Sequence, residues 1–178
     1  TFYEIRMSGS PAGYTHYQVE SDEEDLVMQT TVFFNIGQGD LDQEIKLVAN
    51  TRLNAQTLLP VEYHLSTYIN GFTQSTIDTQ FVNNIATQHI DAGGHNFDNE
   101  ISLPPATYLV DNNFRIDHYN IALRQYDFEK RSTQSFHILV PLAIPQLPRA
   151  VVLQLTWVGG EKLSIGGTVY QTDLLEAD

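Results

Sequence analysis

Three side chains near residue 90 are of the types that bind transition metals. His89 and Asp91 are two residues apart, so they share one face of a strand, and His95 follows after a glycine turn. Together they could offer two imidazoles and one carboxylate to an ion. A zinc site, however, needs convergent ligands with hydrogen-bonding support, and the sequence supplies no fourth ligand. We interpret the three residues as polar side chains at the wet end of a strand, and we predict no metal site and no cofactor.

Acidic residues suggest two further kinds of chemistry. Residues 22–25 are four consecutive carboxylates that could attract a cation. Such a run between two strands is more typical of a solvated turn, which also discourages edge-to-edge pairing. Glu44 and Glu62 could approach each other on facing strands, as the paired carboxylates of glycosidases do. Both belong to strand faces that we expect to meet water, so we assign neither a catalytic role.

Nucleophilic catalysis has little support in the sequence. There is no cysteine, and Ser10 lacks both the G-x-S-x-G spacing and the strand-to-helix setting of a hydrolase nucleophile. Asp117 and His118 are neighbours on a predicted helix, where consecutive side chains point about 100° apart and do not face each other. We therefore predict no catalytic residue and a non-enzymatic function. A hydrolase whose site is assembled from dispersed residues is retained as an alternative.

Charge and composition narrow the range of partners. The 178 residues include 22 acidic and 9 basic side chains, which gives a formal net charge of −13. This acidic protein would repel phosphate backbones, so we predict no nucleic-acid partner. No apolar run is long enough to span a membrane. The chain opens at Thr1, without Met and inside a predicted strand, which we interpret as a processed or trimmed chain. Together with the family resemblance described below, this predicts a periplasmic or secreted protein.

Hydrophobic side chains alternate with polar ones over much of the first hundred residues. The alternation is clearest over residues 41–50 and 61–70, and Asn70-Gly71 then provides the residues that a type I′ hairpin turn requires. Period-two segments separated by turn residues predict antiparallel strands paired in sequential order. We expect these strands over residues 1–8, 14–20, 26–36, 41–52, 61–70, 72–82, 85–91 and 96–103.

The pattern changes after Pro104-Pro105. Residues 106–126 have apolar side chains at helical spacing, which predicts one helix, although Asp111 could instead cap a shorter one. Strands follow over residues 135–140 and 150–158, with a hairpin turn at 159–162, short strands to residue 172 and an unpaired tail. We predict a single β-rich domain over residues 1–178. Its fold class is mainly β, a long antiparallel meander curved into a half-barrel or open barrel, with one α-helix on its concave face.

Short motifs in the first two-thirds of the chain carry a family resemblance. Tyr3-x-Ile5, Gly9, Ala12-Gly13-Tyr14 and Leu58-Leu59-Pro60 resemble passages of exported bacterial proteins with curved β-sheets. The group includes uncharacterised domains that precede transglutaminase-like modules, and its architecture resembles the lipoprotein-carrier half-barrel with a helical lid. The resemblance covers roughly residues 1–127 and implies a hydrophobic cavity between sheet and helix. No ligand-contact position of the carrier family has a matching motif in this chain.

We therefore predict an exported binding or interaction domain with an apolar or amphipathic ligand held between sheet and helix. The 19 aromatic side chains could pack a core or line such a lumen. The predicted lining residues are Ile45, Leu47, Tyr63, Leu65, Ile69 and Phe114. The predicted partner is a hydrophobic small molecule or lipid. The alternative is a structural accessory domain with a dry core, whose partner is a protein or a downstream domain.

Overall fold

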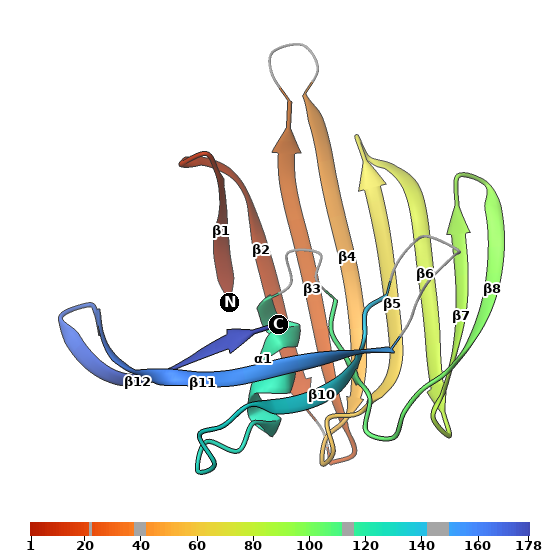
Figure 1. Cartoon of the computed structure of the whole chain (residues 1–178). Helices are drawn as coiled ribbons and strands as arrows, with labels where there is room; N and C mark the ends of the chain where they lie inside the picture. The colour runs from red at the N-terminus through yellow and green to blue at the C-terminus, as the bar shows by residue number, and fades with distance from the viewer. Residues whose placement is uncertain (22, 38–41, 112–115, 142–149) are drawn as a thin grey trace.

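A long antiparallel meander forms most of the protein. The computed structural model describes residues 1–21, 23–37, 42–111, 116–141 and 150–178. Eight strands pair in chain order into one sheet, as predicted (Figure 1). They are β1 (Phe2–Met7), β2 (Ser10–Ser21), β3 (Asp25–Ile36), β4 (Gln43–Asn54), β5 (Pro60–Ile69), β6 (Phe72–Val82), β7 (Ile85–Ala92) and β8 (His95–Ser102). The mainly β fold class is confirmed.

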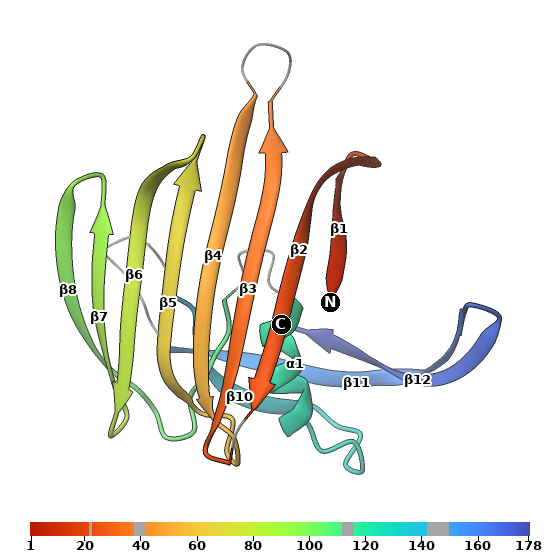
Figure 2. The ribbon, with the colours of Figure 1, turned by 180° about the vertical axis from the view of Figure 1, so that it is seen from behind.

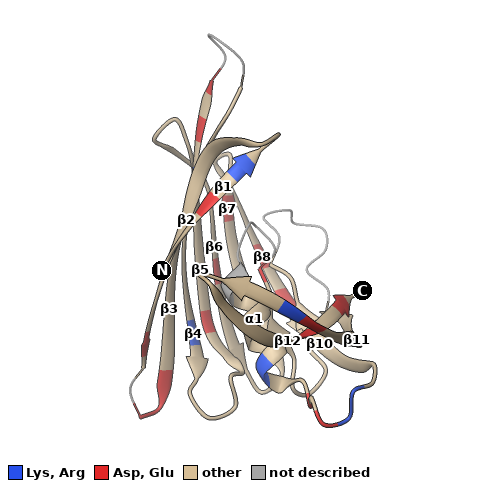
Figure 3. Cartoon of the chain, turned by 90° about the vertical axis from the view of Figure 1, so that its left-hand side faces the viewer, with Lys and Arg blue, Asp and Glu red and all other residues tan. Residues whose placement is uncertain are grey.

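A second, smaller sheet and one helix lie on the same side of this meander. The second sheet has the order β12-β11-β10-β9, in which β9 and β10 are parallel and the other pairs are antiparallel. Its strands run across those of the first sheet, and the side view shows the two layers with α1 (Figures 1 and 3). The bounds are β9 (Tyr108–Leu109), α1 (Ile116–Gln125), β10 (Gln134–Leu139), β11 (Ala150–Ile165) and β12 (Thr168–Ala177).

Alternate side chains of the strands are buried on one face of the meander, and this is the face that the other elements cover. Along β4, Leu47, Ala49, Thr51 and Leu53 are buried, whereas the residues between them are at least partly exposed. Leu109 and Leu139, from β9 and β10, join the main apolar cluster of the first sheet. The predicted helix on the inner face is therefore confirmed, but it shares that face with a second sheet that the sequence did not reveal. Figure 2 shows the outer face, which no described element covers.

The predicted start of the helix at residue 106 is wrong. Ala106 has a φ of 55°, a left-handed conformation that ends any right-handed helix there. Tyr108 and Leu109 instead pair with Ile138 and Leu139 as a short parallel ladder. The alternative of a shorter helix capped by Asp111 depends on residues 112–115, which lie outside the described residues. Helix α1 is ten residues long, and none of the described helices is long and apolar enough to cross a membrane.

The C-terminal hairpin also differs from the prediction. Residues 159–162 do not turn but continue β11, because they pair with β12. A register shift between Trp157 and Gly159, typical of a β-bulge, accommodates the irregularity. The turn lies at Gly166 and Gly167, both with the positive φ that a tight hairpin needs. Residues 173–178, predicted to be unpaired, pair with β11, and Asp178 exchanges two backbone hydrogen bonds with Gln154.

Candidate functional site: a pocket between the helix and the first sheet

Helix α1 presents an apolar side to β3 and β4. Ile121 and Ala122 are buried, and Ile121 packs with Met28 and Leu53 of the sheet in a small separate cluster. His118 lies one turn earlier and is also fully buried. Residues three and four apart share one helix face. This spacing places His118 beside the apolar contact rather than in water.

A buried polar network anchors the helix to the sheet. His118 Nδ1 accepts the backbone N–H of Asp111 at 2.9 Å, and His118 Nε2 lies 3.0 Å from Thr51 Oγ1 of β4. Because Nδ1 is an acceptor, the neutral ring carries its proton on Nε2, which donates to the Thr51 hydroxyl oxygen. The hydroxyl of Tyr63 donates to Asp111 Oδ2 at 2.6 Å. All four residues are almost completely buried, so the network is closed to a substrate and serves to hold α1 in place.

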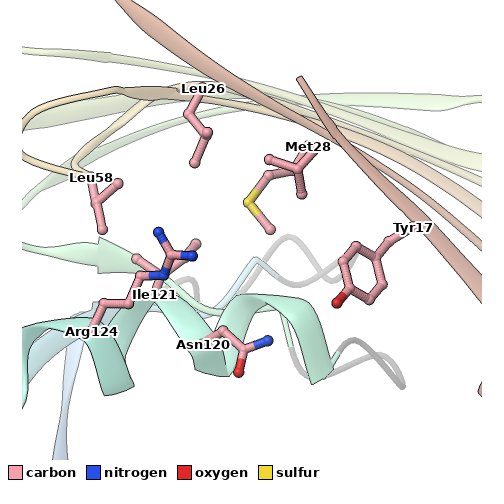
Figure 4. A pocket seen from close by; sticks show the side chains of 8 residues that line it. Tyr17, Leu26, Met28, Leu58, Asn120, Ile121 and Arg124 are labelled. Atoms are coloured by element: carbon pink, nitrogen blue, oxygen red, sulfur yellow. The ribbon is translucent and has the colours of Figure 1, made fainter. Parts of the chain in front are cut away.

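Next to this anchor, a pocket of about 230 Å³ lies between α1 and the strands β2 and β3. Ile121 and Met28 are buried, whereas Val19 is 47% exposed. Figure 4 shows the guanidinium of Arg124 turned into the pocket, with Tyr17 at the opposite end. The pocket is lined by Tyr17, Val19, Leu26, Met28, Leu58, Asn120, Ile121 and Arg124.

Arg124 gives the apolar pocket one positive charge. It stands in the last turn of α1, where the helix dipole favours a cation. Some of the other described cations have acidic partners: Arg52 bridges to Asp25 and Glu62, and Lys130 to Asp127. Arg124 has no acidic partner among the residues that the structure describes. In a protein of net charge −13, a cation at an apolar pocket can attract an anionic group.

Four of the six predicted lining residues belong to the main apolar cluster or pack against it, and none of those that the structure describes lines this pocket. Leu47, Tyr63 and Leu65 are buried in the main apolar cluster, and Ile45 packs against that cluster. Ile69 is half-buried near the end of β5. Phe114 lies outside the described residues. Ligand contact at these six positions stays a prediction, and the pocket beside α1 is lined by other residues. The sequence analysis placed Tyr17, Val19, Leu26 and Met28 on predicted strands and Ile121 on the predicted helix, but nothing in it indicated that these residues meet.

The outer face carries the polar candidates from the sequence. His89 Nδ1 lies 2.7 Å from Asp98 Oδ1 on β8, and this hydrogen bond raises the pKa of His89 above its ordinary value. The nearby carboxylates of Asp78 and Asp91 raise it further. Among the described residues, no group of three or more metal-binding side chains is placed to hold an ion.

The paired glutamates are apart as well. Glu62 binds Arg52 of β4, whereas Glu44 stands opposite Asn35 of β3, eight positions from Arg52 along β4. Asp117 is outside the residues whose side chains are described, and its neighbour His118 faces Thr51. None of the acid pairings considered from the sequence is therefore formed by described side chains.

Comparisons with known proteins found similarity to one solved structure. No family model and no curated protein matches the chain. The chain is similar to the crystal structure of a DUF1089 family protein from Pseudomonas aeruginosa, over 94% of this chain and 85% of that one. The identity is 13% and the TM-score is 0.44, values too low to carry an argument about function. The comparisons give no support to the lipoprotein-carrier fold or to domains that precede transglutaminase-like modules.

Proposed function

We propose that the protein binds an amphipathic ligand with an acidic head and an apolar tail in the pocket beside α1. The observation that carries the proposal is the position of Arg124, whose charged end turns into a pocket lined mostly by apolar side chains (Figure 4). Few polar groups in a mainly apolar concavity are typical of small-molecule sites. A carboxylate or phosphate head would meet Arg124, while the tail would lie against Met28 and Ile121.

The dimensions fit part of an alkyl chain. A buried apolar cavity of about 150 Å³ is enough to hold a benzene molecule, so 230 Å³ accommodates a longer segment. Tyr17, which lines the pocket, stacks on Tyr3 with ring centroids 5.9 Å apart. Tyr3 is outside the lining and is 40% exposed. This aromatic surface on β1 and β2 would cover the part of the tail that does not fit inside.

Binding of dodecanoate, compared with uncharged dodecanol, tests the proposal. We expect native mass spectrometry and calorimetry to show one dodecanoate bound per chain. Arg124→Gln should weaken dodecanoate binding about two- to five-fold, as expected for a partly exposed ion pair, and leave dodecanol binding unchanged. Val19→Glu should abolish binding of both, because it places a carboxylate in the pocket lining.

A matched control separates pocket effects from general ones. Val169 of β12 is an exposed strand valine far from the pocket residues in sequence, and Val169→Glu should leave binding unchanged. Absence of dodecanoate binding, or equal effects of Val19→Glu and Val169→Glu, would refute the proposal.

A structural accessory domain is the second candidate. It is favoured by the exposed apolar side chains of the β11–β12 hairpin, among them Leu163, Ile165, Val169 and Tyr170. Exposed apolar patches of this kind are typical of protein contacts. Failure of dodecanoate and dodecanol to bind under several conditions would favour this function. The periplasmic or secreted location stays a prediction.

A further inference from the structure

A serine, a histidine and an aspartate lie in a hydrogen-bonded line on the outer face of the first sheet. His64 and Ser66 are two residues apart on β5, so their side chains share that face. Asp78 of β6 is the register partner of His64. His64 Nε2 lies 2.9 Å from Ser66 Oγ, and His64 Nδ1 lies 2.6 Å from Asp78 Oδ1.

The order of these contacts decides what His64 can do. Asp78 is an acceptor, so it takes the hydrogen bond from Nδ1–H and fixes the tautomer of the neutral ring. The lone pair of Nε2 is then directed at the Ser66 hydroxyl. This is the geometry in which an imidazole acts as a general base toward a serine, with the carboxylate orienting the ring.

A second histidine–aspartate pair, His89 and Asp98, lies on the same face and serves for comparison. The cross-strand row continues from Asp78 to His89 of β7 and Asp98 of β8. His89 Nδ1 also binds a carboxylate, that of Asp98. No serine contact to His89 Nε2 is present among the described residues. His64 therefore has a serine beside its Nε2, whereas His89 has none among the described residues, and this makes His89 an internal control.

We propose that Ser66, His64 and Asp78 form an acyl-transfer site that hydrolyses small activated esters. Ser66 Oγ attacks the ester carbonyl carbon while its proton passes to His64 Nε2. When the tetrahedral intermediate collapses, the bond to the leaving oxygen breaks and that oxygen takes the proton from Nε2. A water molecule, deprotonated by the same nitrogen, then attacks the acyl-serine and releases the carboxylic acid and free Ser66.

The surroundings define the substrate class. Beside His64 and Asp78 lies an open depression of about 370 Å³, whose lining includes Asn50 and Arg52 but not Ser66. Ser66 is 7% exposed and adjoins the depression through its contact with His64. Arg52 is already paired with two carboxylates, so the depression offers no free cation to an acidic substrate. Both edges of β5 are paired, which leaves its backbone N–H groups committed to the sheet.

Stabilisation of the tetrahedral oxyanion therefore depends on side chains. Asn50 is the register partner of His64, and Thr76 is the register partner of Ser66. Since one oxyanion donor typically contributes about 10²–10³ in rate, a site without backbone donors needs a good leaving group. We infer that uncharged aryl esters with short acyl groups are substrates and that amides are not.

Labelling with a fluorophosphonate probe and turnover of p-nitrophenyl acetate test the site. Peptide mapping should place the phosphonyl group on Ser66, and Ser66→Ala should abolish labelling. His64→Gln should slow labelling and turnover by about 100-fold or more, as expected for loss of general-base catalysis. His89→Gln should leave both rates within about two-fold of the unmodified protein, because no serine among the described residues contacts that ring.

Asp78 is a positioning residue, and its test needs a readout that loss of structure would not produce. Asp78→Asn should slow labelling, because the ring loses the acceptor that fixes its tautomer and orientation, and rescue by a longer carboxylate distinguishes this positioning role from loss of structure. Asp78→Glu should restore part of the rate. Circular dichroism confirms the fold of each variant, and dodecanoate binding should be unchanged in Ser66→Ala because the pocket lies on the opposite face.

Three results would overturn the proposal. The first is the absence of labelling in the folded protein, and the second is a label on another residue. The third is an equal loss of turnover in His64→Gln and His89→Gln, which would indicate hydrolysis by surface imidazoles without a serine. Each of these outcomes leaves the proposed ligand pocket unaffected, so the two functions can fail separately.

Discussion

Replacing Thr51 by valine tests the buried link between α1 and the first sheet. Valine keeps nearly the same shape and removes Oγ1, the atom that lies 3.0 Å from His118 Nε2. The backbone N–H of Asp111 donates to the other ring nitrogen, so the ring proton must reside on Nε2. Thr51→Val therefore deprives a donor of its acceptor at a position that is 0% exposed.

The size of the effect follows from burial. A buried donor without its partner costs about 1–3 kcal/mol of unfolding free energy. For a chain of this length each kcal/mol corresponds to roughly 2–4 °C, so we expect the Tm to fall by about 2–12 °C. Thr79→Val is the matched control, because Thr79 is also buried on the inner face. Its hydroxyl accepts from Gln88 at 3.4 Å, near the limit for a hydrogen bond, so its loss should cost less than about 1 kcal/mol.

Urea unfolding followed by circular dichroism measures both variants, and an unchanged m-value would show that the unfolded states are comparable. Nitrogen chemical shifts of the imidazole provide an independent readout of the tautomer of His118. Equal losses of stability in Thr51→Val and Thr79→Val would refute the reasoning. So would a ring proton found on Nδ1 in the unmodified protein.

Two further substitutions have defined outcomes in the same unfolding assay. Gly13→Ala would place a Cβ 1.9 Å from the carbonyl oxygen of Phe33, so we expect the unfolding free energy to fall by about 3 kcal/mol or more. Gly160→Ala, whose Cβ would have a side-chain atom as its nearest neighbour at 3.2 Å, should cost less than about 1 kcal/mol. Similar losses in the two variants would contradict the close approach of β2 and β3 at Gly13. His89→Gln should lower stability at about pH 5 but not at about pH 8.5. The pKa of His89 is raised in the folded protein, so the protonated ring stabilises the fold below the unfolded-state pKa of about 6.5. This stabilisation disappears as the pH rises through the folded-state pKa. An effect that is larger at the higher pH would contradict the pairing with Asp98.

The sequence determined the strands of the first sheet and the face that each side chain meets. Residues 72–82 are one strand in both the prediction and the structure, and Asn70 adopts the positive φ expected at the turn before it. These features are local: side-chain alternation has a period of two, and tight turns need particular residues. Tyr63 and Leu65 are accordingly buried, as their positions on the apolar face of the strand predicted.

Local signals failed where a long-range contact replaced them. Helical spacing over residues 106–126 predicted a helix along that whole segment. Pairing with β10 instead makes Tyr108 and Leu109 a short strand. The glycines at 159 and 160 resemble a turn, but pairing with β12 keeps the chain extended through them. In both cases the partner strand lies elsewhere in the sequence, and its pairing energy overrides local preference.

Only the tertiary structure decided which side chains form the sites. Thr51 and His118 are 67 residues apart, and they meet because α1 packs on β4. The pocket with Arg124 exists because that helix covers part of the inner face and leaves β2 partly open. Ser66 and His64 are close in sequence, yet their alignment with Asp78 depends on the register between β5 and β6. Alternation fixes the face of a side chain, whereas register and packing fix its neighbours, and chemistry depends on neighbours.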